Sequence, residues 1–458
     1  MPALIQPRTP PGTLELLPRE QMVFQHMQDV IRRGFERFGF VPVETPVFEF
    51  KDILLTKSGG ETEKQVYFVQ STGAIKEGHE AELALRFDLT VPLARYVAEH
   101  EHQLAFPFRR YQIQRVYRGE RAQKGRFREF YQCDIDVIGK DKLGIGYDAE
   151  IPAIIVQIFE ELKIGDFTIH FSNRKILRGF LEMRGEADSG KQQLVLREID
   201  KLDKIGKDKV REAVAALGLA PDCIDQLIEL VSFKGTNEQI IQKLNELTTA
   251  SEGLLREGFT ELRHVADALK TLGVPENRAR INLAIARGLD YYTGTVYETL
   301  IDDHPEFGSV CSGGRYDDLA SLYTKSKLPG VGISIGLTRL YDQLTAHKLL
   351  PEQKEKTTAQ VMIALLDMQP GEETQEALYL GTKLRHAGFN VENYWEQGKL
   401  DKKFKYADRV GVPFVIIVGP EELKAGIVKI KNMTTKEQFE VPHDKLVEKL
   451  RALAPSRP

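Results

Sequence analysis

The stretch RRYQIQRVYRGERAQKGRFREFYQCDIDVI, residues 109–138, has the pattern of two β-strands joined by a charged turn. Its flanks, Arg110–Val116 and Phe130–Val137, are strand-like runs. The connecting tip, Gly119–Gly125, is polar and flexible enough to contact a large polyanion such as a nucleic-acid backbone. We therefore predict a rigid hairpin with a mobile, polar tip.

The charges of this hairpin are strongly one-sided. Between Arg109 and Arg128 stand eight basic residues against one acid, Glu120. A solvated charged hairpin is one interpretation of such a run. The other places Arg118 and Arg126 near either end of the hairpin, where arginine is suited to bidentate recognition of phosphate.

The chain before the hairpin is predicted to be a helix followed by an extended segment. Residues 21–39 carry apolar side chains at helical spacing, and Gly39 is placed to end the helix. Phe40–Phe48 is predicted to be extended. Pro42 and Pro46 lie inside it, which assigns it to an edge or an interface rather than to the middle of a sheet.

The chain after the hairpin is predicted to be mainly helical. Residues 148–162 have helical apolar spacing. Between Ala153 and Val274 there is a single proline, Pro221, and we predict a helical insertion over residues 186–275. The helices expected in this region are 194–217, 222–233, 236–247 and 262–272.

The last third of the chain returns to mixed patterns. Strand-like alternation is expected over 281–285, and glycines punctuate residues 288–336. Beyond a charged linker, residues 351–358, strands and helices alternate, which predicts a small α/β domain with a largely parallel sheet. Its expected strands are 360–366, 389–394 and 413–418, and its expected helices are 373–387 and 399–410.

Composition limits the classes of protein that fit. The length of 458 residues suggests two to four domains, and a net charge of −4 excludes a globally basic nucleic-acid coat. The longest apolar stretches are too short to cross a bilayer, and residues 1–20 carry neither a secretory nor a transit pattern. Three isolated cysteines disfavour a disulfide framework and a cysteine zinc site. We therefore expect a cytoplasmic protein without membrane contact.

Two local patterns resemble functional sites but are better explained otherwise. Residues 185–192 match the spacing of a phosphate loop, except that Gln192 replaces the Ser or Thr that binds magnesium. Because the preceding segment is predicted to be a helix, we interpret 185–192 as a helix–helix turn. His100 and His102 lie two residues apart on an expected helix, where their rings point apart, and no metal site is predicted.

Three further clusters combine arginine with glycine: Arg287–Gly294, Gly313–Asp317 and Gly330–Arg339. Plain turns or tight strand packing would explain the glycines of any one cluster. Together with Arg118, the arginines of the first and last clusters suggest a polyphosphate substrate held without a phosphate loop. No activated nucleophile accompanies them, so the chemistry that fits is attack on phosphorus by a substrate's own carboxylate, promoted by positioning and charge neutralisation.

In this order, the segments resemble the motifs of the class II aminoacyl-tRNA synthetases, and more narrowly the histidyl-tRNA synthetase family. Helix 21–39 and the strand around Pro46 are similar to motif 1, which forms the dimer in that class. Residues 118–130 resemble motif 2, and residues 332–339 resemble motif 3.

The two histidine-specific segments of the family also have counterparts. They are Arg287-Gly-Leu-Asp-Tyr-Tyr292 and Gly313-Gly-Arg-Tyr-Asp317. The family usually has glycine after the second segment, where this chain has Asp318, so the local turn departs from the family pattern.

The resemblance implies a set of ATP contacts. Arg118 would hold the α-phosphate together with the histidine carboxylate, and Glu120 would read the adenine amino group. Phe130 would stack on the adenine, while Arg126 and Arg339 would bind the terminal phosphates. Mg²⁺ would be bound with these phosphates.

The resemblance also implies contacts to the amino-acid backbone of histidine. Asp88 and Thr90 would hold its α-ammonium group, assisted by Gln132. Arg118 and Arg287 would be the catalytic residues, with Arg287 stabilising the α-phosphate charge during transfer and also contacting the bound histidine.

The side chain of histidine would be read by a carboxylate and a hydroxyl. By the same resemblance, Asp136 and Tyr292 would contact the imidazole nitrogens, with Tyr291 nearby. An analogue without those nitrogens would leave Asp136 buried and unpaired, which is a large penalty. The alternatives are that Asp136 forms a plain salt bridge and that Gln132 is a strand surface residue.

The resemblance covers almost the whole chain and implies its organisation. The fold would be an α+β class II catalytic domain, an antiparallel sheet flanked by helices, with a helical insertion and a C-terminal α/β anticodon-binding domain. The expected boundaries are 1–185 and 276–350 for the catalytic domain, 186–275 for the insertion and 358–458 for the anticodon-binding domain. A homodimer would activate L-histidine with ATP to histidyl-adenylate and transfer it to tRNA(His), with the insertion over the acceptor arm.

Two non-catalytic interpretations compete with a ligase. The regulatory subunit of ATP phosphoribosyltransferase keeps a synthetase-like fold to sense histidine, and a silent tRNA-sensing module is also conceivable. Both predict lost active-site residues, whereas the motif arginines are all present here. The basic run Lys399–Lys405 is compatible with anticodon contact and, nearly as well, with a solvated helix face.

Overall fold

The computed structural model forms two compact units. One unit comprises Met1–Glu15 and Phe24–Pro351, and the other comprises Leu16–Val23 and Glu352–Pro458. The structure describes residues 4–55, 65–120, 125–249, 252–285, 292–317, 319–350, 356–365, 372–396 and 398–453.

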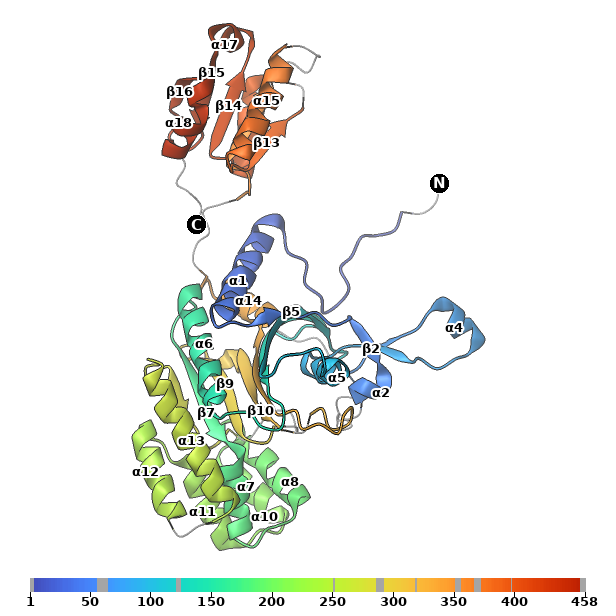
Figure 1. Ribbon diagram of the computed structural model, residues 1–458, viewed down its shortest axis with the longest axis vertical. Coiled ribbons are helices and arrows are strands. Elements are labelled where there is room, and N and C mark those ends of the chain that lie inside the picture. The colour runs from blue at the N-terminus through green and yellow to red at the C-terminus, as the bar shows by residue number, and fades with distance from the viewer. Residues whose placement is uncertain are drawn as a thin grey trace. The chain divides into compact units, whose positions relative to one another are not determined.

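The first unit is built on a sheet that has eight strands within the described residues (Figure 1), in the order β1-β5-β6-β11-β10-β9-β7-β8. The β1–β5 and β7–β8 pairs are parallel and the others antiparallel, so the predicted antiparallel sheet is confirmed. The predicted hairpin forms β5 and β6, and β1, which contains Pro42, lies at an edge as expected. The strands are β1 Val41–Pro42, β5 Phe108–Tyr117, β6 Glu129–Ile138, β7 Phe167–Asn173, β8 Ala279–Ile281, β9 Thr295–Ile301, β10 Cys311–Tyr316 and β11 Gly330–Gly336.

Helices with one apolar face pack around this sheet. In α6, the predicted apolar stripe is fully buried. A Cβ at Gly34 would lie 2.4 Å from Cγ1 of Ile158, so α1 and α6 approach closely at this glycine. These helices are α1 Pro18–Arg37, which begins three residues before the predicted start, α5 Thr90–His100, α6 Gly146–Leu162 and α14 Leu337–Ala346.

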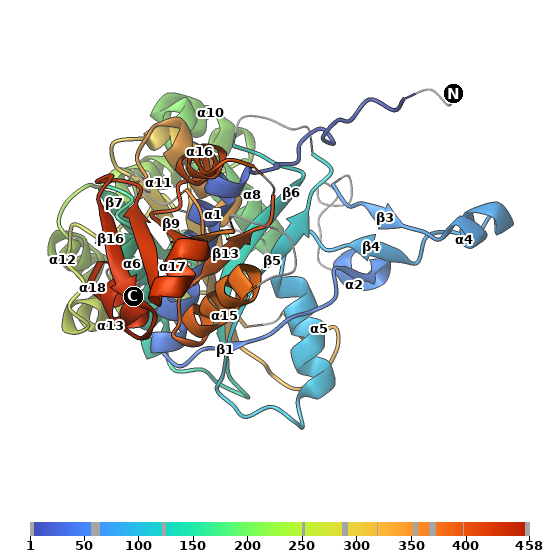
Figure 2. The ribbon, with the colours of Figure 1, turned by 90° about the horizontal axis from the view of Figure 1, so that it is seen from above.

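A small three-stranded sheet, β2-β4-β3, belongs to the same unit. In Figure 2, its strands and α4 extend away from the large sheet. Its elements are β2 Phe48–Phe50, α2 Lys51–Leu55, β3 Phe68–Val69, α4 Thr72–Glu77 and β4 Leu83–Leu85.

The predicted helical block is present beside β7 (Figure 1), with some boundaries corrected. The single helix expected over 194–217 is wrong, because Gly206 has φ +83 and ends a helix there. Residues 184–188 connect two helices, so a helix–helix turn rather than a phosphate loop is present, but it is shorter than the predicted 185–192 because residues 189–192 belong to the next helix. The helices are α7 Arg174–Met183, α8 Ser189–Ile199, α9 Leu202–Ile205, α10 Lys207–Ala216, α11 Pro221–Ser232, α12 Asn237–Thr248 and α13 Leu254–Thr271.

The strand expected over 281–285 is shorter than predicted. β8 ends at Ile281, and Leu283, Ala284 and Ile285 are buried in a turn. Apolar residues at alternate positions can thus be buried in an irregular segment, and here they led to a wrong strand prediction.

The second unit is an α/β domain whose sheet has the order β13-β12-β14-β15-β16. The first three strands are parallel, as predicted, and the last two add an antiparallel hairpin that the sequence analysis missed. β12 and β14 bury both faces, one beneath α15 and α18 and the other beneath α16, as central parallel strands do. The elements are β12 Val361–Leu365, α15 Glu372–His386, β13 Val391–Tyr394, α16 Leu400–Val410, β14 Phe414–Val418, α17 Pro420–Ala425, β15 Ile427–Asn432, β16 Gln438–Pro442, η2 His443–Lys445 and α18 Leu446–Leu453.

Candidate active site

The register of the central strands creates a polar face on the large sheet. Across β5 and β6, Gln112 lies opposite Asp134, and Arg110 lies opposite Asp136. Across β6 and β11, Asp134 lies opposite Ser334. Because every second side chain of a strand points to the same face, these residues share one side of the sheet.

A cavity of about 370 Å³ lies over one end of this face. It collects all five residues that the sequence assigned to ATP, from segments about 200 positions apart. Its lining includes Arg118, Glu120, Arg126, Phe130 and Arg339, together with Gln132, Ser312, Ser334 and Gly336.

The charged side chains of this cavity are held by specific contacts. Nε of Arg118 donates to the carbonyl of Phe87 at 3.1 Å, and its guanidinium lies 5.2 Å from the ring centre of Phe130. Arg126 and Glu120 form an ion pair at 3.3 Å. This pair leaves both side chains at the cavity wall, where a nucleotide would compete for them.

Arg339 stands at the first turn of α14, opposite the motif 2 hairpin. Nη2 of Arg339 donates to the carbonyl of Phe307, the last residue of η1 (Pro305–Phe307). Nε2 of Gln343, one helical turn later, donates to the same carbonyl at 3.1 Å. The turn at η1 therefore helps to aim Arg339 at the cavity.

A second, smaller cavity adjoins the first. It is lined by Thr90, Asp136 and Tyr292, all assigned to histidine from the sequence, and also by Asp134, Ser312, Tyr316, Gly332, Ile333 and Ser334. Ser312 and Ser334 line both cavities, so the two spaces share a wall.

Asp136 is held from two sides. Nη2 of Arg110 lies 2.6 Å from Oδ2 of Asp136, and the hydroxyl of Tyr316 donates to Oδ1 at 2.8 Å. Burial raises the pKa of Asp136, while the charge of Arg110 and the Tyr316 hydrogen bond oppose that shift. The salt bridge of the alternative interpretation is therefore present, with Arg110 as the partner, and the sequence analysis assigned no role to Arg110 or Tyr316.

Asp88 stands just before α5. Its Oδ1 accepts from the backbone N–H of Val91 at 3.1 Å, and its Oδ2 has no hydrogen-bond partner within the described residues. Burial raises the pKa of Asp88 to about 6, while the Val91 N–H and the charge of Arg118 act to lower it. A buried carboxyl with one unpaired oxygen is suited to a cationic group of a ligand.

Gln132 is oriented by its neighbour on β11. Its Nε2 donates to Oγ of Ser334 at 3.0 Å, while Oε1 is buried without a partner in the described part of the chain. Gln132 is thus a member of the polar face and lines the larger cavity, rather than the solvent-facing strand residue of the alternative interpretation.

Most glycines of the motifs make room for protein rather than for a flat ligand. A Cβ at Gly332 would lie 2.1 Å from Oδ1 of Asp136, and one at Gly330 would lie 2.4 Å from the ring of Tyr316. Among the described motif glycines, Gly336 is the least crowded, since a Cβ there would lie 3.8 Å from the carbonyl oxygen of Val310, and Gly336 lines the larger cavity. Tight packing therefore explains Gly330 and Gly332.

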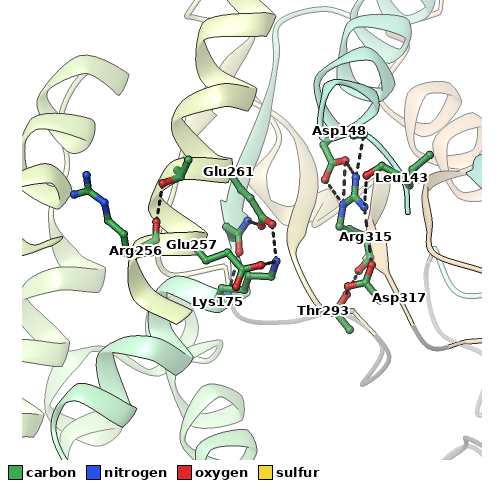
Figure 3. A network of polar contacts seen from close by, with 12 residues as sticks. Leu143, Asp148, Lys175, Arg256, Glu257, Glu261, Thr293, Arg315 and Asp317 are labelled. Atoms are coloured by element: carbon green, nitrogen blue, oxygen red, sulfur yellow. Dashed lines mark hydrogen bonds and ion pairs between the residues drawn. The ribbon is translucent and has the colours of Figure 1, made fainter. Parts of the chain in front are cut away.

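Arg315, in the middle of the second histidine-specific segment, faces away from both cavities. Figure 3 shows its guanidinium directed at Asp148 of α6, and its Nε donates to Oδ1 of Asp148 at 3.0 Å. It also donates to the carbonyls of Leu143 and Gly144. This arginine anchors β10 to α6.

The structure does not describe every residue that the sequence assigned to the site. Arg287, Tyr291 and Asp318 lie outside the described residues. The convergence expected of three arginines therefore holds for Arg118 and Arg339.

One cluster with metal-ligand chemistry was not singled out by the sequence. His304, Glu306 and His347 place ligand atoms within 4.8 Å of one another. Nδ1 of His304 lies 3.0 Å from Oε1 of Glu306, and its ring stacks on Phe307. Pairing and stacking account for this cluster without an ion.

Among the helices that the structure describes, none is long and apolar enough to cross a membrane.

Comparison with known proteins agrees with this geometry. A family model described as histidyl-tRNA synthetase matches residues 12–340, and one described as anticodon binding domain matches residues 360–453. The chain belongs to the histidyl-tRNA synthetase family. The family predicted from the sequence is thus confirmed, together with the enzyme class of a histidine–tRNA ligase.

Individual relatives support the same assignment over the full length. The histidine–tRNA ligase of Stenotrophomonas maltophilia is 56% identical over 98% of both chains. That of Xanthomonas campestris pv. campestris is 56% identical over 98% of this chain and 96% of the relative. The crystal structure of histidyl-tRNA synthetase from Nostoc sp. PCC 7120 is 40% identical, with a TM-score of 0.87 over 98% of this chain and 100% of the relative. These relationships favour the ligase over the regulatory-subunit alternative.

Proposed function

We propose that the two adjoining cavities hold ATP and L-histidine for the synthesis of histidyl-adenylate, which is then transferred to tRNA(His). The observation that carries this proposal is the shared wall formed by Ser312 and Ser334. The smaller cavity measures about 20 Å³, room for about one water molecule, so a histidine ring would enter it by displacing the lining side chains. The carboxylate of that histidine would then point toward the α-phosphate of a nucleotide in the larger cavity. A carboxylate oxygen then bonds to the α-phosphorus as the bond to the leaving diphosphate breaks.

Cationic residues would lower the barrier by positioning and charge neutralisation. Arg118 is near enough to Asp88 to lower its pKa and also lines the nucleotide cavity, so it fits a bridge between the α-phosphate and the histidine carboxylate. Arg287 would stabilise the α-phosphate charge. The remaining ATP contacts would be Glu120, Arg126, Phe130 and Arg339.

The amino acid would be held at both ends. Asp88, Thr90 and Gln132 would bind the α-ammonium group, because two of them have buried, unpaired acceptor atoms within the described residues. Asp136 and Tyr292 would bind the imidazole nitrogens, with Tyr291 and Arg287 completing the site.

Magnesium would reach the site on the phosphates of ATP. Glu120 is the one carboxylate among the described residues that line the larger cavity, and it already pairs with Arg126. The donor set therefore fits an ion coordinated mainly by phosphate and water, which would neutralise charge on the phosphates.

We propose that the wider assembly also follows the family pattern. A homodimer through motif 1 is supported by exposed apolar side chains at Val41, Val47, Phe48 and Phe50. We assign residues 1–185 and 276–350 to the catalytic domain, 186–275 to the insertion over the acceptor arm, and 358–458 to anticodon binding. A cytoplasmic location stays a prediction.

Anticodon contact by the run Lys399–Lys405 would involve three of its four lysines. Lys403 is buried, and its Nζ donates to the carbonyl of Glu396 at 2.6 Å. Lys399, Lys402 and Lys405 are exposed and could face RNA phosphates.

The direct test is ATP–pyrophosphate exchange with each of the twenty amino acids. We expect exchange with histidine alone, followed by charging of tRNA(His). Exchange with a different amino acid, or none with histidine, would overturn the proposed function.

A further inference from the structure

Asp134 is a carboxylate on the floor of the smaller cavity to which no motif assigns a role. It lies on β6 between Gln132 and Asp136, two residues from each, so all three side chains share one face of the sheet. Asp134 is 2% exposed and lines the cavity together with Asp136 and Tyr292.

The two aspartates of the cavity differ in how their oxygens are satisfied. Both oxygens of Asp136 are engaged, one by Arg110 and one by Tyr316. Asp134 is hydrogen-bonded by Ser334, but its Oδ1 is buried without a partner among the residues that the structure describes. A buried unpaired carboxylate oxygen is costly, so a ligand group is expected to complete it.

No cation forms an ion pair with Asp134 among the residues that the structure describes. The guanidinium of Arg110 forms its ion pair with Asp136. Opposite Asp134 on β5 stands Gln112, whose Nε2 donates to Oγ1 of Thr45 and Oε1 of Gln114. The floor of the pocket thus carries two carboxylates against one guanidinium.

We propose that Asp134 binds the imidazole ring of the substrate as a second carboxylate beside Asp136, and so contributes to selectivity for histidine. This inference rests on the proposed placement of histidine in the smaller cavity.

The chemistry of the ring matches this arrangement. Neutral imidazole has one N–H donor and protonated imidazole has two, so two carboxylate acceptors favour the protonated ring. Burial raises the pKa of Asp134 to about 7, with Arg110 lowering it and Asp136 and Asp88 raising it further. A cationic ring beside Asp134 would oppose this effect of burial and favour the ionised carboxylate.

The alternative ligand for Asp134 is the α-ammonium group. That group already has Asp88, with its own unpaired oxygen, at the end of the site next to Arg118. Of the residues that line the small cavity with Asp134, two (Asp136 and Tyr292) are assigned to the ring and one (Thr90) to the ammonium group, which favours the ring.

The test is Asp134→Asn in the full-length chain, with Gln114→Asn as the matched control. Gln114 lies on β5 opposite Gln132, and its side chain bonds to Gln112 rather than lining either cavity. Loss of a charge-assisted hydrogen bond predicts that Asp134→Asn raises the KM for histidine about ten- to a hundredfold. The KM for ATP should stay within about twofold, and the control should change neither.

A substrate fragment separates the ring from the ammonium group. 3-(Imidazol-4-yl)propionate keeps the ring and lacks the ammonium, so Asp134→Asn should weaken its binding by a factor similar to that for histidine. Unchanged binding of this fragment with a raised histidine KM would assign Asp134 to the ammonium instead, and an unchanged histidine KM would make it purely structural. Either result overturns the inference.

Folding and the proposed function are checked separately. Thermal unfolding and the KM for ATP report whether the Asp134→Asn variant is folded. If that variant does not fold, Asp134→Ser is used in the same measurements. Absence of histidine-dependent exchange in the unmodified chain would fault the proposed function itself. Normal exchange in the unmodified chain, together with an unchanged histidine KM in the Asp134 variant, would contradict only this inference.

Discussion

Replacing Arg110 with methionine removes the cation that pairs with Asp136 while keeping an unbranched apolar chain in its place. The two side chains are 0% and 4% exposed, and the N–O distance is 2.6 Å. Removal of one partner from such a buried pair costs about 3–5 kcal/mol, because the other charge is left uncompensated. For a unit of this size, whose unfolding entropy grows with its length, we expect the midpoint of thermal unfolding to fall by about 4–7 °C.

The same change should weaken histidine binding. The charge of Arg110 lowers the pKa of Asp136 against the effect of burial, so its loss favours the protonated carboxyl. Each unit of pKa above the assay pH costs about 1.4 kcal/mol to restore the carboxylate. If the carboxyl instead stays protonated, a charge-assisted hydrogen bond worth about 1.5–3 kcal/mol is lost. Either way, we expect the KM for histidine to rise about ten- to a hundredfold.

Pyrophosphate exchange at saturating ATP measures this KM, and Arg315→Met is the matched control. Arg315 forms another buried pair, with Asp148, but faces away from both cavities. It should lower the unfolding midpoint similarly and leave the histidine KM within about threefold. An unchanged KM in Arg110→Met, or equal KM effects in both variants, would refute the reasoning that Arg110 keeps Asp136 ready for the ring.

Three further variants test other parts of the site. Arg339→Ala should raise the KM for ATP about tenfold or more through loss of a charged contact, with little change in the KM for histidine in the same exchange assay. Gly332→Ala places a Cβ 2.1 Å from Oδ1 of Asp136. Overpacking should therefore lower the free energy of unfolding in denaturant by about 1–3 kcal/mol and raise the histidine KM. Unchanged stability and KM would show that the strand can shift to make room. Burial raises the pKa of Asp134 to about 7, above the ordinary value of about 4. Because the folded chain binds this proton more tightly than the unfolded chain, the folded state loses stability as pH rises from about 4 to 7. Asp134→Asn should therefore unfold at a higher temperature than the unmodified chain at pH 8, and the difference should shrink toward pH 5.

Local patterns predicted much of the fold. The helix near residues 21–39, the hairpin of β5 and β6 and the α/β order of the C-terminal unit follow from side-chain periodicity, which acts over a few residues. The errors have local causes as well. Gly206 ended a helix at a positive φ, and buried residues 283–285 imitated a strand.

The sequence predicted the residues that line the candidate site, but not the residues that hold those side chains in place. The alternation Gln132, Asp134, Asp136 was visible in the sequence as three polar residues on one face of a strand. It could have pointed to Asp134. Arg110 and Tyr316 could not be found this way, because they come from other strands and meet Asp136 only through sheet register.

The sequence by itself determined most of the helices and strands, which family the motifs resemble and which side chains could bind phosphate. Tertiary structure alone decided which charges are paired, since Arg110 meets Asp136, Arg315 meets Asp148 and Asp134 keeps an unpaired oxygen within the described residues. The physical reason is that pairing and desolvation depend on distances between atoms of different strands. These distances are set by strand order and register, and no local pattern encodes them.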